Sequence, residues 1–239
     1  MNELDKQLLI DKYGSIEAIQ DKLDNNYPIQ YLIGYVDFYG YKINVDERAL
    51  IPRYETEGLI ELVLNTIKDN GLNITNILDI GTGTGCIDIV LSKKLNNTNI
   101  STIDISADAL ELAKDNYKIN NVNNVEVINK DIFEYNTNNK YDLIISNPPY
   151  VDVNEEVDES TKYEPQNAIF ADNQGLIFYE YIIKNSVNWV KDKSIIAFEI
   201  GYNQGNYLLK YAKEYYPNAI IEIKKDLSNR DRYLLIINK

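Results

Sequence analysis

The sequence contains no histidine and only one cysteine, Cys86. The lack of histidine excludes catalysis by an imidazole, as in serine and cysteine hydrolases, and it excludes histidine-ligated zinc or iron sites. A single cysteine cannot form a disulfide within the chain. Because it has no imidazole partner, we expect Cys86 to be a small buried residue rather than a nucleophile. Carboxylates, amides, tyrosines, lysines and backbone groups remain as candidates for chemistry.

The sequence also lacks long apolar runs and clusters of basic residues. No run approaches the ~20 apolar residues that cross a bilayer. The N-terminal segment Met1–Lys6 carries acids where a signal peptide carries positive charge. The formal net charge of −13 would repel phosphates. We therefore expect a cytoplasmic protein without membrane or direct nucleic-acid contacts, and we take it to be a monomer.

The 239 residues suffice for one large domain with a smaller unit attached. A broken helical pattern of leucines and isoleucines predicts a short helical segment over residues 1–30. Residues 31–54 are rich in β-formers around Gly40 and predict a β-hairpin followed by a linker. Residues 55–239 are expected to form the main domain, which begins with a helix over 55–68.

Predicted strands and helices alternate from residue 76 onward. Strands are predicted at 76–80, 100–104, 125–128, 141–146, 195–200, 219–224 and 232–238. Helices are predicted at 85–95, 107–120, 175–190 and 203–215. Such alternation predicts an α/β fold whose Rossmann-like, seven-stranded sheet is mostly parallel and covered on both faces. The tight turn Ser228–Asp231 joins the last two strands, so one of them must run antiparallel.

A glycine-rich turn follows the first of these strands. It reads Gly81-Thr82-Gly83-Thr84-Gly85. Glycines let the backbone turn tightly and approach a ligand closely. Asp104 ends the next strand, where this fold places an acid for ribose hydroxyls. The spacing is neither that of a dinucleotide fingerprint nor that of a P-loop. A ligand-binding turn is favoured, and a purely structural turn is the alternative.

The tetrapeptide Asn147-Pro148-Pro149-Tyr150 follows the strand at 141–146, which places it at the carboxyl edge of the sheet beside the glycine turn. It could be a simple turn. However, the Asn147 side-chain oxygen and the Pro148 carbonyl are two acceptors that could hold the two N–H groups of a planar amide or aromatic amine. That grip would aim the nitrogen lone pair at a methyl donor, and Tyr150 could stack on the planar group. No histidine is needed, because the methylated nitrogen sheds its proton afterwards.

Both motifs resemble those of class I S-adenosylmethionine-dependent methyltransferases, in which they are shared by adenine-N6 enzymes and protein-glutamine enzymes. Further segments resemble the release factor glutamine methyltransferase family, and together the similar regions span residues 28–239. These segments are 28–34, 38–40, 50–57, 163–168, 172–176, 198–201 and 226–232.

The resemblance implies transfer of a methyl group from S-adenosylmethionine to the side-chain nitrogen N5 of a glutamine, leaving S-adenosylhomocysteine and needing no metal. The glutamine would lie in the Gly-Gly-Gln loop of a peptide-chain release factor, a protein of translation termination. The implied cofactor-binding residues are Asp79, Gly81, Thr82, Gly83, Thr84, Gly85, Asp104, Ile132 and Asn147. Asn147, Pro148, Pro149 and Tyr150 would bind the substrate, and Asn147, Pro148 and Tyr150 would be catalytic.

The sequence departs from this family in three places. Tyr54 replaces a usual proline, and Ile132 stands where an aromatic residue is often found, so adenine packing is expected to differ. Only about thirty residues precede the similar region, where the family has a fuller helical domain, so altered partner recognition is expected. Arg53, Thr56 and Glu57 match a family segment near the cofactor, and the Thr-Glu pair favours release factors over a ribosomal protein as substrate.

Two further alternatives are an adenine-N6 DNA or RNA methyltransferase and a cofactor-binding scaffold without catalysis. The first would need a basic groove, which the sequence does not offer, and the intact residues 147–150 argue against the second. The segment Asp152–Glu159 holds five acids. It is either a solvated loop or a flexible rim that attracts a basic loop of the partner.

Overall fold

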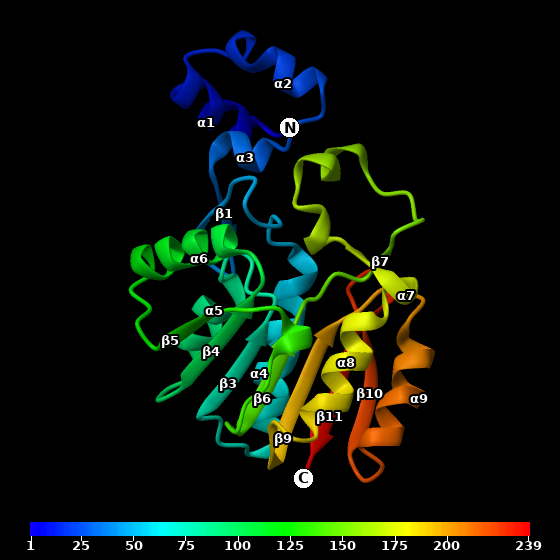
Figure 1. The fold of residues 1–239 in the computed structure, drawn as a ribbon. Coiled ribbons are helices and arrows are strands. Elements are labelled where there is room, and N and C mark those ends of the chain that lie inside the picture. Colours follow the sequence, from blue (N-terminus) through cyan, green and yellow to red (C-terminus); the bar gives the residue numbers. More distant parts are fainter.

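The computed structural model describes all residues from 1 to 239 and is built around one seven-stranded sheet (Figure 1). The order of its strands is β10-β11-β9-β6-β3-β4-β5. Their bounds are β3 (Asn76–Ile80), β4 (Asn99–Asp104), β5 (Val125–Asn129), β6 (Tyr141–Ser146), β9 (Val190–Glu199), β10 (Ile220–Lys225) and β11 (Asp231–Asn238). Strand β11 runs antiparallel to both of its neighbours, and the other neighbouring pairs are parallel. The predicted fold, including its antiparallel strand, is therefore confirmed.

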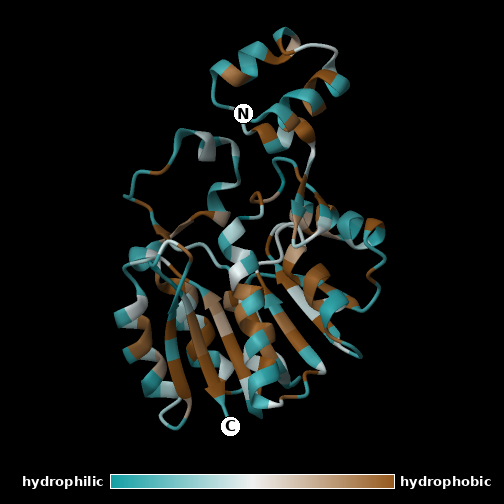
Figure 2. Ribbon diagram, turned by 180° about the vertical axis from the view of Figure 1, so that it is seen from behind, coloured by the Kyte–Doolittle hydropathy of each residue, from teal (hydrophilic) through white to brown (hydrophobic).

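Helices cover both faces of the sheet, because the side chains of a strand alternate between its faces. Ile77 packs into one core and Leu78 into another. The helices α4 (Tyr54–Asn70), α5 (Cys86–Lys94) and α6 (Ala107–Ile119) pack against the first face, and α8 (Ile177–Ser186) and α9 (Gly205–Tyr215) against the second. Figure 2 shows that the hydrophobic residues are concentrated on the strands and on the inner sides of these helices.

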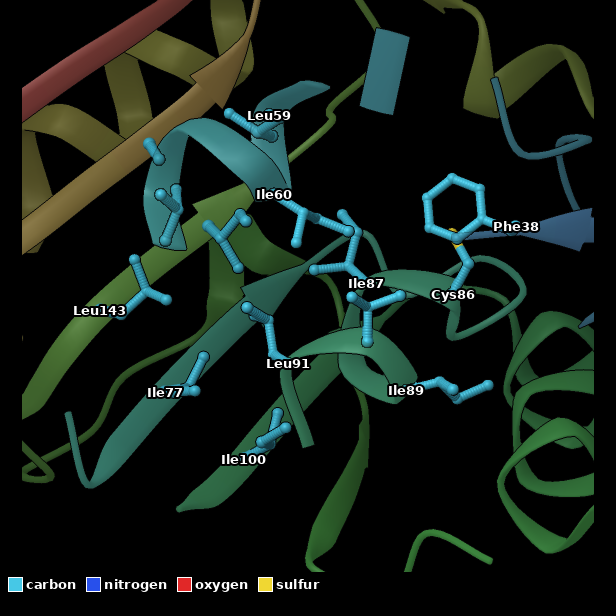
Figure 3. Close-up of a cluster of buried hydrophobic side chains, with 14 of the residues drawn as sticks. Phe38, Leu59, Ile60, Ile77, Cys86, Ile87, Ile89, Leu91, Ile100 and Leu143 are labelled. Atoms are coloured by element: carbon cyan, nitrogen blue, oxygen red, sulfur yellow. The ribbon is translucent and has the colours of Figure 1, made fainter. Parts of the chain in front are cut away.

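The N-terminal residues form a small helical unit and a hairpin. Helices α1 (Glu3–Tyr13), α2 (Gln20–Asp24) and α3 (Ile29–Ile33) surround a cluster of Leu9, Ile19 and Leu32. The hairpin consists of β1 (Tyr35–Phe38) and β2 (Tyr41–Asn44). Figure 3 shows that Phe38 reaches from the hairpin to Cys86 at the start of α5. The hairpin is thus anchored on the core of the main sheet.

The hairpin begins at Tyr35 and not at residue 31, because α3 occupies part of the predicted β region. Pro28 precedes this helix, and Gly34 ends it in a left-handed conformation with φ +94°. A glycine in this conformation is a common helix stop. These two residues, rather than the β-forming residues between them, decide the local structure.

The prediction of a helix over 175–190 is wrong at its carboxyl end. Helix α8 stops at Ser186, and β9 already begins at Val190, before the predicted start at residue 195. Trp189 is buried against Tyr135, and its carbonyl accepts a hydrogen bond from the N–H of Tyr141 at 2.8 Å. The chain has therefore left the helix by Trp189, whose backbone already bonds to β6.

The connection between β6 and α8 contains elements that the sequence analysis did not predict. They are β7 (Val151–Asp152), the 3₁₀ helices η3 (Glu159–Tyr163) and η4 (Gln166–Ala168), β8 (Phe170–Ala171) and the short α7 (Asp172–Gly175). Tyr163 packs edge-on against Tyr27 at a centroid distance of 4.9 Å, and its hydroxyl donates to the carbonyl of Asn25 at 2.9 Å. The connection therefore contacts the N-terminal unit. None of the helices is both long and apolar enough to cross a bilayer.

Candidate active site

A cavity of about 260 Å³ lies at the carboxyl ends of β3, β4 and β6. One water molecule needs only about 10–15 Å³ measured in the same way, so the cavity has room for an organic ligand. Three segments far apart in the sequence contribute to its wall: the glycine turn, the end of β6 with Asn147, and residues 48–53 before α4. In open α/β sheets ligands bind at this edge.

The glycine turn forms one wall of the cavity. Gly81, Gly83 and Gly85 have φ angles of +84°, +52° and +76°, a region that disfavours side chains. A Cβ on Gly85 would lie 2.6 Å from the ring of Tyr117. Gly81, Thr82, Gly83 and Thr84 line the cavity, whereas Gly85 lies behind it. This bare backbone provides the close approach that a nucleoside ligand requires.

Asp104 is held beside the glycine turn by backbone donors. Its Oδ2 accepts from the N–H of Gly83 and its Oδ1 from the N–H of Ser106, both at 2.9 Å. Burial raises the pKa of Asp104 above its ordinary value, although these hydrogen bonds oppose the shift. The carboxylate lines the cavity and keeps lone pairs for further donors. Its position suits the recognition of ribose hydroxyls.

Asp79 does not line the cavity but is fully buried beneath the turn. Neither of its carboxyl oxygens accepts a hydrogen bond. Burial, together with the nearby Asp88, raises the pKa of Asp79 well above its usual range. Burial likewise raises the pKa of the Cys86 thiol to about 12, which is unfavourable for a nucleophile.

The far end of the cavity is apolar. Ile132 is buried and lines it, and its predicted contact with an adenine stays a prediction. Phe133 and Phe178 line it too, with their ring centroids 5.2 Å apart. The sequence analysis missed these two residues, because they come from separate elements and no motif joins them. They supply the aromatic surface that Ile132 lacks.

Asn147, Pro148 and Pro149 line the cavity close to the glycine turn. The Asn147 carbonyl lies 3.8 Å from the position of a Cβ on Gly81. The Nδ2 of Asn147 donates to Oγ1 of Thr56 at 3.1 Å. No protein group donates to the Asn147 Oδ1 or to the Pro148 carbonyl, so both remain available as acceptors. This pair could hold the two N–H groups of an amide.

Tyr150 lies outside the cavity lining. Its hydroxyl points to the buried carboxyl group of Glu199, with 3.4 Å between Tyr150 Oη and Glu199 Oε1. Its stacking on the substrate amide stays a prediction. Glu199 accepts a second hydrogen bond, from Thr56 Oγ1 at 2.8 Å. The sequence analysis gave no role to Glu199.

Arg53 and Glu164 connect two walls of the cavity. The Arg53 guanidinium pairs with Glu164 Oε1 at 2.5 Å, and the other carboxyl oxygen of Glu164 accepts from the N–H of Ile51 at 3.0 Å. Glu164 is buried, so this carboxylate replaces its water shell with protein donors. The contact ties the segment before α4 to the long connection after β6.

The chain is similar to known methyltransferases in sequence and in fold. The model of the methyltransferase small domain family matches residues 59–164. A release factor glutamine methyltransferase of Lactococcus lactis subsp. lactis (strain IL1403) is 40% identical over 224 residues, which are 92% of this chain and 81% of that protein. One of Streptococcus pneumoniae (strain ATCC BAA-255 / R6) is 37% identical, with coverages of 92% and 78%. The solved hMettl16 catalytic domain is similar with a TM-score of 0.63 at 19% identity, covering 84% of this chain and 77% of that chain, which supports the fold.

Proposed function

The chain belongs to the release factor glutamine methyltransferase family, and from this membership we propose that it methylates the N5 nitrogen of a glutamine in the Gly-Gly-Gln loop of peptide-chain release factors. It is accordingly a protein-glutamine N5-methyltransferase that uses S-adenosylmethionine. The observation that carries the proposal is the pair of free acceptors, Asn147 Oδ1 and the Pro148 carbonyl, beside the glycine turn.

The residues of the cavity fit S-adenosylmethionine. Gly81 and Gly83 would let the backbone approach it, Asp104 would accept hydrogen bonds from its ribose, and Ile132 with Phe133 would enclose its adenine. When bound, S-adenosylmethionine supplies an electrophilic methyl group on a positively charged sulfur. The turn and the tetrapeptide line the same cavity, so the methyl donor and the acceptor amide can meet there.

The chain contributes orientation rather than acid–base chemistry. The two acceptors would each take one N–H of the glutamine carboxamide, which favours a more tetrahedral nitrogen with its lone pair aimed at the methyl group. The new bond would join this nitrogen to the methyl carbon as the bond from that carbon to the sulfur breaks, and the sulfur would keep the electron pair as the neutral thioether of S-adenosylhomocysteine. The methylated nitrogen then releases a proton to water, so no imidazole is required at the site.

The function is tested by incubating the protein with methyl-labelled S-adenosylmethionine and each of three acceptors. We expect label in an intact release factor, and none in the same factor with its Gly-Gly-Gln glutamine changed to alanine or in DNA. Label in DNA would support the adenine-N6 alternative. Cofactor binding without label in any of the three would leave a scaffold or a methyltransferase of a ribosomal protein, and the same incubation with that ribosomal protein decides between them.

We further propose that the acidic stretch Asp152–Glu159 attracts a basic partner loop. Asp158 caps the 3₁₀ helix η3, and Glu159 accepts from Asn26, so these two acids also have structural contacts. Glu155 and Glu156 are exposed, and their side chains make no hydrogen bond or ion pair within the protein. Changing these two residues therefore tests the electrostatic attraction of a basic partner loop without removing a structural contact.

Changing Glu155 and Glu156 to glutamine is expected to lower kcat/KM for the intact factor several-fold at low salt, because the attraction is electrostatic. The methylation of a short neutral Gly-Gly-Gln peptide should not change. Initial rates at low and high salt measure both effects. The matched control replaces two exposed acids at the opposite edge of the sheet, Asp192→Asn with Glu214→Gln. Equal losses for factor and peptide, or for the control pair, would refute the proposal.

A further inference from the structure

A buried chain of hydrogen bonds connects Asn147 to the interior of the protein. Asn147 follows β6, Thr56 lies in the first turn of α4, and Glu199 ends β9. The Asn147 Nδ2 donates to Thr56 Oγ1 at 3.1 Å, and Thr56 Oγ1 donates to Glu199 Oε2 at 2.8 Å. Thr56 and Glu199 are 3% and 1% exposed, so water does not compete for these bonds. Three separate elements thus meet at the side chain of Asn147, the proposed hydrogen-bond acceptor for the substrate amide.

The number of protons on each group decides which atom is the donor in the hydrogen bonds that join Asn147, Thr56 and Glu199. An ionised carboxylate can only accept, so the Thr56 hydroxyl must donate its single proton to Glu199. Only lone pairs of Thr56 then face Asn147, and they require the NH2 end of the amide. The oxygen of Asn147 is thereby left facing the cavity. Because the two ends of an amide have the same shape, this hydrogen-bond network decides which end reaches the substrate.

We infer that Thr56 and Glu199 are positioning residues that hold the Asn147 amide with its oxygen toward the substrate. The inference rests on the proposed function, because a glutamine NH2 group needs an acceptor at this point. A reversed amide would present its own NH2 to that of the substrate, so two donors would face each other. Neither Thr56 nor Glu199 needs to contact the substrate for this effect.

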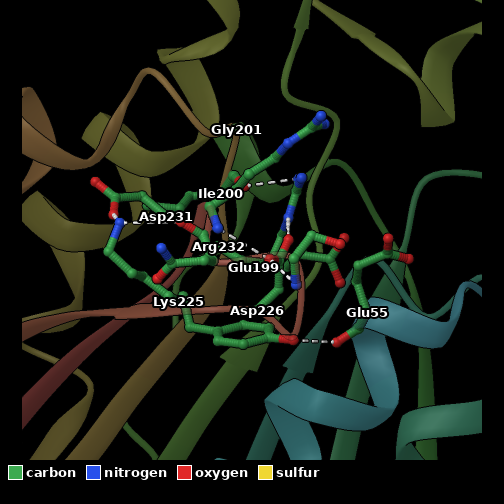
Figure 4. Close-up of polar contacts among 12 residues, drawn as sticks. Glu55, Glu199, Ile200, Gly201, Lys225, Asp226, Asp231 and Arg232 are labelled. Atoms are coloured by element: carbon green, nitrogen blue, oxygen red, sulfur yellow. Dashed lines mark hydrogen bonds and ion pairs between the residues drawn. The ribbon is translucent and has the colours of Figure 1, made fainter.

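The surroundings of Glu199 contain several titratable groups. Figure 4 shows Arg232 of β11 beside Glu199, with Glu55 at the start of α4 nearby. The other such groups around Glu199 are the hydroxyls of Tyr150, Tyr179 and Tyr233. Arg232 also pairs with Asp226 at 3.3 Å and donates to the carbonyl of Ile200 at 3.2 Å. Its positive charge is therefore shared among several partners.

Burial raises the pKa of Glu199 to about 7, although the hydrogen bond from Thr56 and the charge of Arg232 oppose the shift. Below this pH the carboxyl group is protonated and can itself donate to Thr56. The Thr56 proton is then free to turn toward Asn147 and to favour the reversed amide. Activity should consequently rise with pH through about 7 and level off above it, where Glu199 is ionised.

The test compares Thr56→Val, which has nearly the same shape but no hydroxyl, with Thr56→Ser, which keeps one. We expect Thr56→Val to lower kcat/KM for the release factor by about 10²-fold and to abolish the rise near pH 7. Thr56→Ser should recover most of the loss and keep the rise. Adding Glu199→Gln to Thr56→Val should cause little further loss, because both act through one hydroxyl. The dissociation constant for S-adenosylmethionine should stay unchanged throughout.

A second readout does not depend on methyl transfer. With ¹³C-labelled glutamate, NMR titration should show a higher pKa for Glu199 in Thr56→Val than in the unmodified protein, since the ionised form has lost a donor. An unchanged Glu199 titration, or a Thr56→Val variant with full activity and the same pH profile, would overturn the inference. If the unmodified protein transfers no label to a release factor, the proposed function fails. The titration of Glu199 still decides whether the hydrogen bond from Thr56 to Glu199 exists.

Discussion

Replacing Asn147 with alanine is expected to lower the kcat of methyl transfer by about two to three orders of magnitude while leaving the binding of S-adenosylmethionine largely intact. The change removes one of the two acceptors that would grip the glutamine NH2 group, and removing one placed polar group of this kind costs about 10²–10³-fold in kcat. The glycine turn and Asp104 do not depend on the amide, because Gly83 and Ser106 hold Asp104. Turnover should therefore fall while the affinity for S-adenosylmethionine is kept.

Two measurements check this expectation: single-turnover methylation of a release factor, and the dissociation constant of S-adenosylmethionine by calorimetry. Asn147→Asp is the matched variant, because it keeps an oxygen toward the cavity but loses the donor to Thr56. A carboxylate there would also be repelled by Glu199, so we expect intermediate activity that falls at high pH. Retention of most of kcat in Asn147→Ala would contradict the proposed grip. A loss of cofactor binding would instead mean that Asn147 serves the cofactor.

The central strands of the sheet could be predicted well because they are buried on both faces. All six residues of β6 are buried, and the apolar run 143–145 within it stands out from the polar segments around the strand. The same signal misplaces the end of α8, where Trp189 and Val190 extend the apolar run into the next strand. A short apolar run does not distinguish a buried helix from a buried strand.

The position of Asn147 and Pro148 at the cavity could be predicted from the sequence because these residues are contiguous. Asn147 and Pro148 follow a strand directly, and the end of a parallel strand is where ligands bind in this fold. The residues of the hydrogen-bond chain behind Asn147 could not be predicted in the same way. Thr56 and Glu199 are separated by 143 positions, and only the packing of α4 against β9 brings them together. The aromatic pair Phe133 and Phe178 is joined in the same manner.

Gly175 packs closely against Tyr150, the last residue of the tetrapeptide Asn147–Tyr150. Its φ is +75°, and a Cβ there would lie 2.0 Å from the Tyr150 carbonyl oxygen and 2.7 Å from Gln204 Nε2. Gln204 in turn donates to that carbonyl at 3.0 Å and accepts from the N–H of Gly201 at 2.8 Å. The tetrapeptide therefore rests on a backbone surface that has no room for a methyl group.

Gly175→Ala is consequently expected to impair both stability and catalysis. Left-handed strain and overpacking together should lower the free energy of unfolding by about 2–5 kcal/mol. The displaced Tyr150 carbonyl should shift Asn147 and Pro148, and a shift of about 1 Å can cost about 10²-fold in rate. Chemical denaturation and kcat below the melting transition measure the two effects. Gly40→Ala is the matched control, with φ +80° and no atom within 4 Å of the added Cβ, so it should lose about 1–2 kcal/mol and no activity. Equal stability and equal kcat in the two variants would show that the tetrapeptide does not depend on this contact.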